Sequence, residues 1–532
     1  MSNAFRTTVP RVRTVAVIDV GTSSIRMAIA EIQADGSIRT LESLTQAVHL
    51  GRDAFMNGEL SRGTIEECVS VLRSFRQKLD EYQITRSEDI RVVATSAVRE
   101  AQNRLAFIDR IYVATGLSVE TLDEAEIHRI IYRGIQPLLK AERRLFTSES
   151  IVIEVGGGST ELLTLVQGNV AHSHGFRLGA LRLQQTVSSY RVARSKIRQV
   201  YDGEIHSHLE PYTEFLRNRV GAHLIAMGGD IRFAAEEILS CSLSDDSLVE
   251  LPTEKLAEFV EYVFSRSDDQ LVSEFHLTYP EAETVGAALL VNLTLAQQLE
   301  APQLLVSNLN LRDGLLRDIS EGGSWTDDFQ RQIIRATWEL ARRYHVDEDH
   351  ARNVAELCRQ LFRQLKKEHG LDDRFETLLY VAAALHETGA FINTSSMHKH
   401  SMYLIMNSTL FGLTSDDLQL VGLVARYHRR SMPKTIHQPY ASMDRSRRVV
   451  VSKLAAILRL ALALDASRNQ RIRQIECHRI RNRIIVSVPA LDDLSVEQIS
   501  LRRNQLFFES IFGLEVLLRP QVRQTNSERT ML

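Results

Sequence analysis

The sequence has few cysteines, with only four in 532 residues: Cys68, Cys241, Cys358 and Cys477. They lie far apart and form no Cys-x-x-Cys pair, so neither a disulfide framework nor a zinc knuckle is expected, and a reducing compartment fits best. No apolar run reaches the roughly 18 residues that a membrane span needs, and the N-terminus lacks a secretory apolar region. We therefore expect a cytoplasmic protein that makes no contact with a membrane.

Proline and low-complexity sequence are also scarce, with 10 prolines in the whole chain. Apolar residues make up 44% and charged residues 25%, which is the composition of an ordered globular protein. A chain of 532 residues exceeds what one hydrophobic core usually supports, so several domains are expected.

The net charge of −3 is unevenly distributed. Between Arg426 and Lys453 the sequence has eight Lys or Arg residues and one acid, Asp444. Such a stretch is either a solvated surface or the lining of a channel for a long polyanion. The candidate channel residues are Arg426, His428, Arg429, Arg430 and Lys434. Aromatic residues that could stack on bases are sparse there, so nucleic acid is not the expected partner.

One short segment occurs twice. Residues 17–24 read Val-Ile-Asp-Val-Gly-Thr-Ser-Ser, and residues 152–159 read Val-Ile-Glu-Val-Gly-Gly-Gly-Ser. The two align without a gap, which places Asp19 on Glu154. Each copy predicts a strand, an acid near its end, a turn of small residues and a second strand. We call residues 19–24 the first clip and residues 154–159 the second clip.

Each clip is a candidate anion site, because successive backbone N–H groups in a tight turn form a concave surface and glycine permits close approach. A carboxylate at the strand end can then hold Mg²⁺ or a water. One copy alone is more often a plain hairpin, whereas two matched copies indicate two jaws that close on one phosphate chain. The phosphate-binding candidates are Gly21, Thr22, Ser23, Ser24, Gly156, Gly157, Gly158 and Ser159, with Gly228 and Gly229 at a further strand-to-helix turn.

Arg99 and three acids lie near predicted helix starts. Arg99 belongs to a helix expected from Ser96 to about Ala114, where its guanidinium can meet a phosphate or form a surface salt bridge. Asp123, Glu124 and Glu126 crowd the first turn of the next helix, where acids commonly complement the helix dipole.

The order of strands and helices predicts an α/β protein with two similar lobes in tandem and a cleft between them. From about residue 322 helical periodicity replaces the strand signals, and residues 475–488 then alternate like a hairpin before a last helix. We expect a first lobe at 1–125, a second lobe at 126–320, a helical domain at 321–470 and a small α+β domain at 471–532.

The ordered motifs resemble the exopolyphosphatase/guanosine pentaphosphate phosphatase (Ppx/GppA) family. They are Asp-x-Gly-Thr-x-Ser at 19–24, Ala-Thr-Ser-Ala-Val-Arg at 94–99, the acids at 123–126 and Gly-Gly-Gly-Ser-Thr-Glu at 156–161. The resemblance implies two actin-like (ASKHA, ribonuclease-H-like) lobes followed by an all-α HD-like domain and a small α+β C-terminal domain.

The resemblance also implies Mg²⁺-dependent hydrolysis of the terminal phosphoanhydride of inorganic polyphosphate or guanosine pentaphosphate, without an organic cofactor. A glutamate on the helix entering the second lobe would activate the water, and this role maps onto Glu126, with Glu124 as the alternative. Arg99 would clamp the terminal phosphate. The metal ligands would be Asp19, Glu154 and Glu161. The duplicated domains and the long basic face make a homodimer the expected assembly.

Two departures from the family pattern lie in the clips. Glu154 stands where the family usually has Asp, and Ser23 stands where it usually has Asn. Both changes keep a non-catalytic sensor of phosphonucleotides or polyphosphate open as an alternative. An ATP-dependent kinase on the same fold is a further alternative.

The third departure lies in the helical domain. Its histidines, with Glu387 and Asp465, suggest either a metal cluster or packing and phosphate contacts: His345, His350, His386, His398, His400 and His428. Metal-binding HD domains usually have a His-Asp pair where this chain has His386-Glu387. They also have a later Ala-Asp pair where this chain has Ala461-Leu462. On this basis we predict no catalytic metal in the helical domain.

Overall fold

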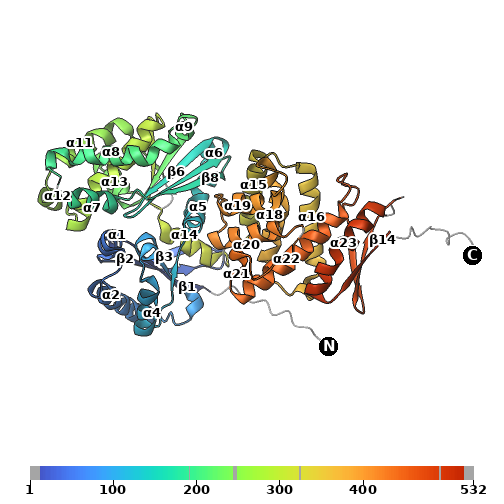
Figure 1. Ribbon diagram of the computed structural model, residues 1–532. Coiled ribbons are helices and arrows are strands. Elements are labelled where there is room, and N and C mark those ends of the chain that lie inside the picture. Colours follow the sequence, from blue (N-terminus) through green and yellow to red (C-terminus); the bar gives the residue numbers. More distant parts are fainter. Residues whose placement is uncertain are drawn as a thin grey trace, which may run out of the picture. The chain divides into compact units, whose positions relative to one another are not determined.

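Residues 12–190, 192–243, 248–322, 325–429, 431–489 and 493–520 are described by the structure, a computed structural model (Figure 1). The chain divides into two compact units, Met1–Thr326 and Asp327–Leu532. The division lies close to the boundary expected at residue 320. Among the residues described, no helix is long and apolar enough to cross a membrane.

The first sheet carries the first clip. Its strand order is β3-β2-β1-β4-β5, with β1 antiparallel to β2 and parallel to β4. The central strands β1 and β4 are rich in Val, Ile and Ala because most of their residues are buried. The strands are β1 Arg13–Val20, β2 Ser24–Ile32, β3 Ile38–Ala47, β4 Ile90–Ala94 and β5 Val119–Thr121.

The second sheet repeats this arrangement and carries the second clip. Its order is β10-β11-β9-β6-β7-β8, with β6 antiparallel to β7 and parallel to β9. Asp19 pairs with Arg26 in the first copy, and Glu154 pairs with Glu161 in the second. The predicted duplication is therefore confirmed in the backbone. The strands are β6 Glu149–Val155, β7 Thr160–Val166, β8 Asn169–Phe176, β9 His223–Met227, β10 Leu248–Pro252 and β11 Gln303–Ser307.

The helices of the first sheet show one local difference from prediction. The helix expected from Ser96 to Ala114 is broken into two, because the Asn103 amide exchanges hydrogen bonds of 2.8 and 2.9 Å with the backbone of Leu60. The helices here are α1 Leu50–Asn57, α2 Arg62–Glu81, α3 Ser96–Glu100 and α4 Arg104–Thr115. Those of the second sheet are α6 Arg143–Thr147, α7 Ala180–Ser189, α8 Ile197–Leu209, α9 Thr213–Arg217, α10 Gly229–Leu239, α11 Thr253–Ser265, α12 Asp268–Phe275 and α13 Tyr279–Gln298.

Two helices connect the lobes, α5 (Glu124–Ala141) and α14 (Leu311–Ser320). They pack closely through glycine, since a Cβ on Gly134 of α5 would lie 3.5 Å from the backbone nitrogen of Gly314 of α14. Helix α14 also packs on β1, β2 and β3. The first lobe is therefore completed by residues that the sequence assigned to the second lobe.

A buried charge network joins these helices. Asp318 of α14 is 3% exposed and accepts two hydrogen bonds from Arg129 of α5, at 2.6 and 3.0 Å. Arg91 of β4 donates a third at 2.7 Å, and Arg133 lies 3.6 Å away. Three elements that are distant in sequence are thereby held at one buried carboxylate.

The second unit combines helices with a small sheet. Its helices are α15 Asp327–Arg343, α16 Glu348–Gln364, α17 Lys366–His369, α18 Arg374–Leu385, α19 Met397–Met406, α20 Ser415–Arg426, α21 Gln438–Ala441, α22 Arg445–Leu464 and α23 Ser495–Phe512. The predicted hairpin is confirmed, with β13 (Arg483–Val488) antiparallel to β12 (Glu476–Ile480). Strand β14 (Glu515–Pro520) adds in parallel, and α23 packs on α22 and β14.

A methyl group added at Gly314 should disturb the contact between α5 and α14. The new Cβ would clash with the backbone carbonyl oxygen of Ile130, and overpacking of this kind costs about 1–3 kcal/mol. Gly203 of α8 is the matched control, because a Cβ there meets nothing within 4 Å. We expect Gly314→Ala to lower the urea midpoint of unfolding. We expect Gly203→Ala to leave the free energy of unfolding unchanged or to raise it by up to about 1 kcal/mol. A Gly314→Ala midpoint at or above that of the wild type would contradict this packing.

The Asp318 network should make stability depend on acid. Burial acts to raise the pKa of Asp318, but the hydrogen bonds and charge of Arg129, with the charges of Arg91 and Arg133, hold that pKa below its usual value. A carboxyl group of this kind stabilises the fold above its unfolded pKa of about 3.9, and the contribution is lost as the pH falls through the lowered pKa.

The corresponding variant is Asp318→Asn. Removing one partner of a buried ion pair costs about 3–5 kcal/mol, so we expect a large loss of stability at pH 7. The difference between variant and wild type should begin to shrink as the pH falls below about 4, because the carboxyl of the unfolded chain takes up a proton there, and it should shrink further as the pH passes through the lowered pKa of the folded state. Unfolding midpoints of both proteins across pH 3–7 measure it, and a difference that stays constant over that range would exclude the Asp318 charge as its source.

Candidate functional site

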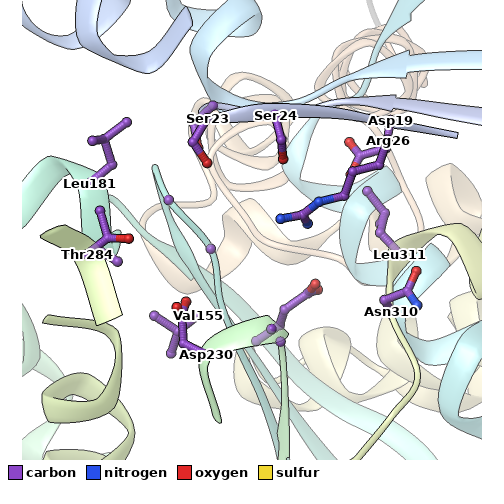
Figure 2. A pocket seen from close by; sticks show the side chains of 18 of the residues that line it. Asp19, Ser23, Ser24, Arg26, Val155, Leu181, Asp230, Thr284, Asn310 and Leu311 are labelled. Atoms are coloured by element: carbon purple, nitrogen blue, oxygen red, sulfur yellow. The ribbon is translucent and has the colours of Figure 1, made fainter. Parts of the chain in front are cut away.

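The two clips have the same backbone geometry. The N–H of Gly21 donates to the carbonyl of Ser24 at 3.0 Å, and the N–H of Gly156 donates to the carbonyl of Ser159 at 2.9 Å. Both clips line one cavity of about 550 Å³ in the first unit. Figure 2 shows Asp19, Ser23 and Ser24 on one side of it and residues of the second lobe, including Asp230, on the other.

Glycine is required where the clips approach each other. A Cβ on Gly157 would clash with the hydroxyl of Thr22, and a Cβ on Gly158 would clash with the hydroxyl of Ser96 and lie 2.6 Å from the Phe55 ring. The small residues that the sequence singled out therefore set how closely the two jaws stand. Gly228 and Gly229 also line the cavity, and Gly228 has a φ of +120°, which few other residues adopt.

Six carboxylates line the cavity: Asp19, Glu154, Glu161, Asp230, Glu236 and Glu281. Burial, together with the charges of Glu161 and Asp19, raises the pKa of Glu154 to about 7. Burial also raises the pKa of Asp230 to about 6 and that of Asp19 above its usual value. A bound cation would offset the charge repulsion that Glu161 and Asp19 exert on Glu154.

The donor set fits an oxygen-binding divalent ion. The Oδ1 atom of Asp19 is buried and has no hydrogen-bond partner among the residues that the structure describes. Glu161 is held in place, since Oε2 is 2.8 Å from Nε2 of His128 and Oε1 accepts from Ser159 at 2.7 Å. Although burial acts to raise its pKa, these contacts keep the pKa of Glu161 below its usual value. Asp19, Glu154 and Glu161 could therefore hold a cation such as Mg²⁺.

Three arginines share the cavity with these acids, and the sequence analysis missed them: Arg26, Arg232 and Arg312. Arg26 follows Ser24 by two residues along β2, so strand periodicity could have placed both on the same face. Arg312 is the second residue of α14, and burial lowers the pKa of its guanidinium. Arg232 is fixed by a hydrogen bond of 2.9 Å to the Asn308 side chain. The cavity thus offers both cationic donors and a metal-binding acid group.

Glu126 is not brought to the cavity. It forms a capping box, in which its carboxylate accepts from the backbone N–H of Asp123 at 3.1 Å and its own N–H donates to the Asp123 side chain at 2.9 Å. Its neighbour Ile127 lines the cavity instead. The interpretation that these acids complement the helix dipole therefore applies to Glu126, whose carboxylate is already engaged in capping the N-terminus of α5.

Glu124 lies beside the cavity acids. Its Oε1 accepts from the backbone N–H of Gly175 at 2.6 Å. A Cβ on Gly175 would lie 2.7 Å from Oε2 of Glu161 and 2.9 Å from Oε1 of Glu124, so the two carboxylates adjoin. Dehydration of the carboxylate and the charge of Glu161 raise the pKa of Glu124, against the charge of His128. The geometry favours Glu124 over Glu126 as the acid nearest the site.

Arg99 takes an intermediate position. One of its guanidinium nitrogens donates to the carbonyl of Leu122 at 2.9 Å, and Arg99 is absent from the residues that line the cavity. Its charge still acts on both Glu124 and Glu161. Arg99 therefore lies behind the acids in this structure.

The basic stretch in the second unit is only partly as expected. His428 is 6% exposed and packs edge-on against His386, with ring centroids 5.0 Å apart, so its assignment to a polyanion channel is wrong. The reason is that α20 ends at Arg426 and the next turn points this ring inward, where its Nδ1 lies 2.6 Å from the carbonyl oxygen of Ala425. Lys434 is exposed, Arg426 and Arg429 are half-buried, and Arg430 lies outside the described residues.

Comparison with known proteins matches this architecture. A model of the Ppx/GppA phosphatase family matches residues 16–321, and a model of Ppx/GppA phosphatase domain III matches residues 334–510. A solved exopolyphosphatase from Cytophaga hutchinsonii is 22% identical, with a TM-score of 0.53, and the match covers 58% of this chain and 99% of that one. A solved Ppx/GppA family member from Aquifex aeolicus is 24% identical, with a TM-score of 0.46, and the match covers 58% and 98%.

The two family matches correspond to the two lobes and to a further C-terminal region. The first family match alone covers more than half of the 532 residues. The chain belongs to the Ppx/GppA phosphatase family.

Proposed function

We propose that the protein hydrolyses the terminal phosphoanhydride of inorganic polyphosphate or guanosine pentaphosphate. The observation that carries this proposal is the cavity in which two matched clips, six carboxylates and three arginines converge. Both substrates present the same terminal anhydride, and a linear phosphate chain is the ligand that fits two opposed anion sites. The exopolyphosphatase from Cytophaga hutchinsonii supports the fold of this proposal.

Mg²⁺ is the proposed cofactor, held by Asp19, Glu154 and Glu161. When bound, it would neutralise the charge of the phosphate oxygens and of the cavity acids. The three carboxylates carry the proposal because Asp19 lies in the first clip and Glu154 in the second, and because the charges of Glu161 and Asp19 raise the pKa of Glu154 when no cation separates them. Glu154 is one methylene longer than the aspartate usual in the family, so its oxygen reaches further into the cavity.

The arginines bind the anion. Arg26, Arg232 and Arg312 line the same cavity as the acids, and guanidinium groups donate paired hydrogen bonds to phosphate oxygens. Backbone N–H groups of the clips would hold the terminal phosphate. Charge that develops on the transferring phosphoryl group is then met by fixed donors that need no reorganisation.

Glu124 is the proposed general base. Its carboxylate would orient a water molecule and accept one of its protons while the water oxygen attacks the terminal phosphorus. The bond between that phosphorus and the bridging oxygen breaks, which releases inorganic phosphate and a chain shorter by one unit. The position of Glu124 next to Glu161 and its raised pKa support this role, whereas the engaged carboxylate of Glu126 does not.

The test compares Glu124→Gln with Glu126→Gln in assays of phosphate release, using long-chain polyphosphate and guanosine pentaphosphate with Mg²⁺. Both changes remove one charge at matched size, and glutamine at 126 can still accept the hydrogen bond from Asp123. We expect Glu124→Gln to lower kcat by about 10²–10⁴-fold, the usual contribution of a general base. Glu126→Gln should stay within a few-fold of wild type.

Other outcomes would assign the roles differently. Loss of activity in Glu126→Gln alone would return the base to that residue. A wild-type protein that binds tripolyphosphate but releases no phosphate from either substrate would be a sensor. ADP formation from ATP with an added acceptor would indicate a kinase.

A further inference from the structure

A second group of chemically reactive side chains lies inside the helical unit. His350 comes from α16, His386 follows α18 directly and Glu387 is the next residue; Figure 1 shows α16 and α18 side by side. One ligand atom from each of these three residues lies within 4.8 Å of the others. His350 is 4% exposed and His386 is 1% exposed. Such a distance lets three donors reach one ion at bond lengths of about 2.0–2.2 Å after small side-chain movements.

Hydrogen bonds fix which ring nitrogen of each histidine can bind. The Nδ1 of His386 lies 2.7 Å from the carbonyl oxygen of Ala383, which can only accept, so this nitrogen carries the proton. Nε2 is then left with a lone pair, and it lies 3.9 Å from Oε1 of Glu387. The ring is thus prepared to coordinate through Nε2.

His350 is oriented by a carboxylate. Its Nδ1 lies 2.7 Å from Oδ2 of Asp465, which caps the C-terminus of α22 and is 1% exposed. Oδ1 of Asp465 accepts from the backbone N–H of Gln470 at 3.0 Å, so the carboxylate itself is held. Histidines that bind metals almost always donate their other N–H to a carboxylate or a backbone carbonyl. Both histidines of this group have that arrangement.

Glu387 provides the connection to solvent. Its side chain is 19% exposed, and its Oε2 is paired with Arg468, whose side chain is 45% exposed. This pairing leaves Oε1 directed to the side of His386. The group is therefore buried on the histidine side and open on the glutamate side, where an ion could enter.

We propose that the helical unit binds one divalent transition-metal ion through His350, His386 and Glu387, with Asp465 positioning His350. Two imidazoles and one carboxylate suit ions such as Zn²⁺, Co²⁺ or Mn²⁺ better than Mg²⁺. Three protein ligands leave a coordination position for water or a ligand. The expectation of no metal rested on Glu387 in place of aspartate and on Leu462. In the structure Glu387 lies within reach of both histidines, and Asp465, three residues after Leu462, positions His350.

The experiment uses the full-length protein, stripped with a chelator and dialysed against micromolar Co²⁺ in excess Mg²⁺, so that the clip acids are occupied by Mg²⁺. We expect one Co²⁺ per chain by elemental analysis, with visible absorption from an ion of low coordination number. Glu387→Gln should weaken binding at least tenfold, and it should fold normally because it removes only a partly exposed ion pair. Asp465→Asn should weaken binding about 10–100-fold.

Two control variants separate this site from others. Glu161→Gln alters the clip cavity, and His478→Ala removes a histidine of the same unit whose side chain is 69% exposed. Both should keep one Co²⁺ per chain. The proposal is overturned if the wild type retains no Co²⁺, if Glu387→Gln binds it as tightly as the wild type, or if Glu161→Gln is the variant that loses it. The thermal midpoint of each variant, measured in parallel, distinguishes loss of the site from loss of the fold.

Discussion

The buried carboxylate of Asp318 is the constraint on which the arrangement of the two lobes depends. A charge with 3% exposure is costly to dehydrate, and that cost is offset only where the geometry is good and the remaining lone pairs are satisfied. Arg129 supplies a two-pronged contact, and Arg91 a third hydrogen bond. Because these partners belong to α5 and β4, the network fixes where both connecting helices cross the first sheet.

The same two helices contribute residues to the cavity from their N-terminal turns. Helix α5 begins at Glu124, little more than one turn before Arg129, and α14 begins at Leu311 and Arg312, two turns before Asp318. The Gly134–Gly314 contact sets how closely the helices pack. The structural network therefore lies within about two turns of the candidate active site along both helices, so errors in packing would be transmitted to the site as displacements of Glu124 and Arg312.

Much of the lobes could be predicted because the signals were local. The duplicated segment predicted a strand, an acid, a turn and a second strand, and the structure has this order in both copies. The start of helix α5 was harder to interpret, although Asp123 followed three residues later by Glu126 has the spacing of a capping box. The structure shows that Glu126 is used in this capping box and that Glu124 adjoins Glu161.

The residues that the sequence analysis missed or misplaced depend on contacts between distant segments. Arg232 and Arg312 meet Arg26 only when both lobes are folded, and His350 meets Asp465 across 115 residues of sequence. His428 lies among the basic residues in sequence, but its ring points inward. A side chain just beyond the end of a helix can point to either side, and His428 is the second residue after the end of α20. Composition and periodicity contain no information on such pairings.

The central claim is that both clips hold one phosphate chain, and hydrogen exchange measures this most directly. With Mg²⁺ and tripolyphosphate, amides of residues 21–24 and 156–159 should exchange more slowly together, with one binding curve, in the Glu124→Gln variant that cannot turn the ligand over. Protection confined to one clip, or to the basic residues 426–434, would contradict the account.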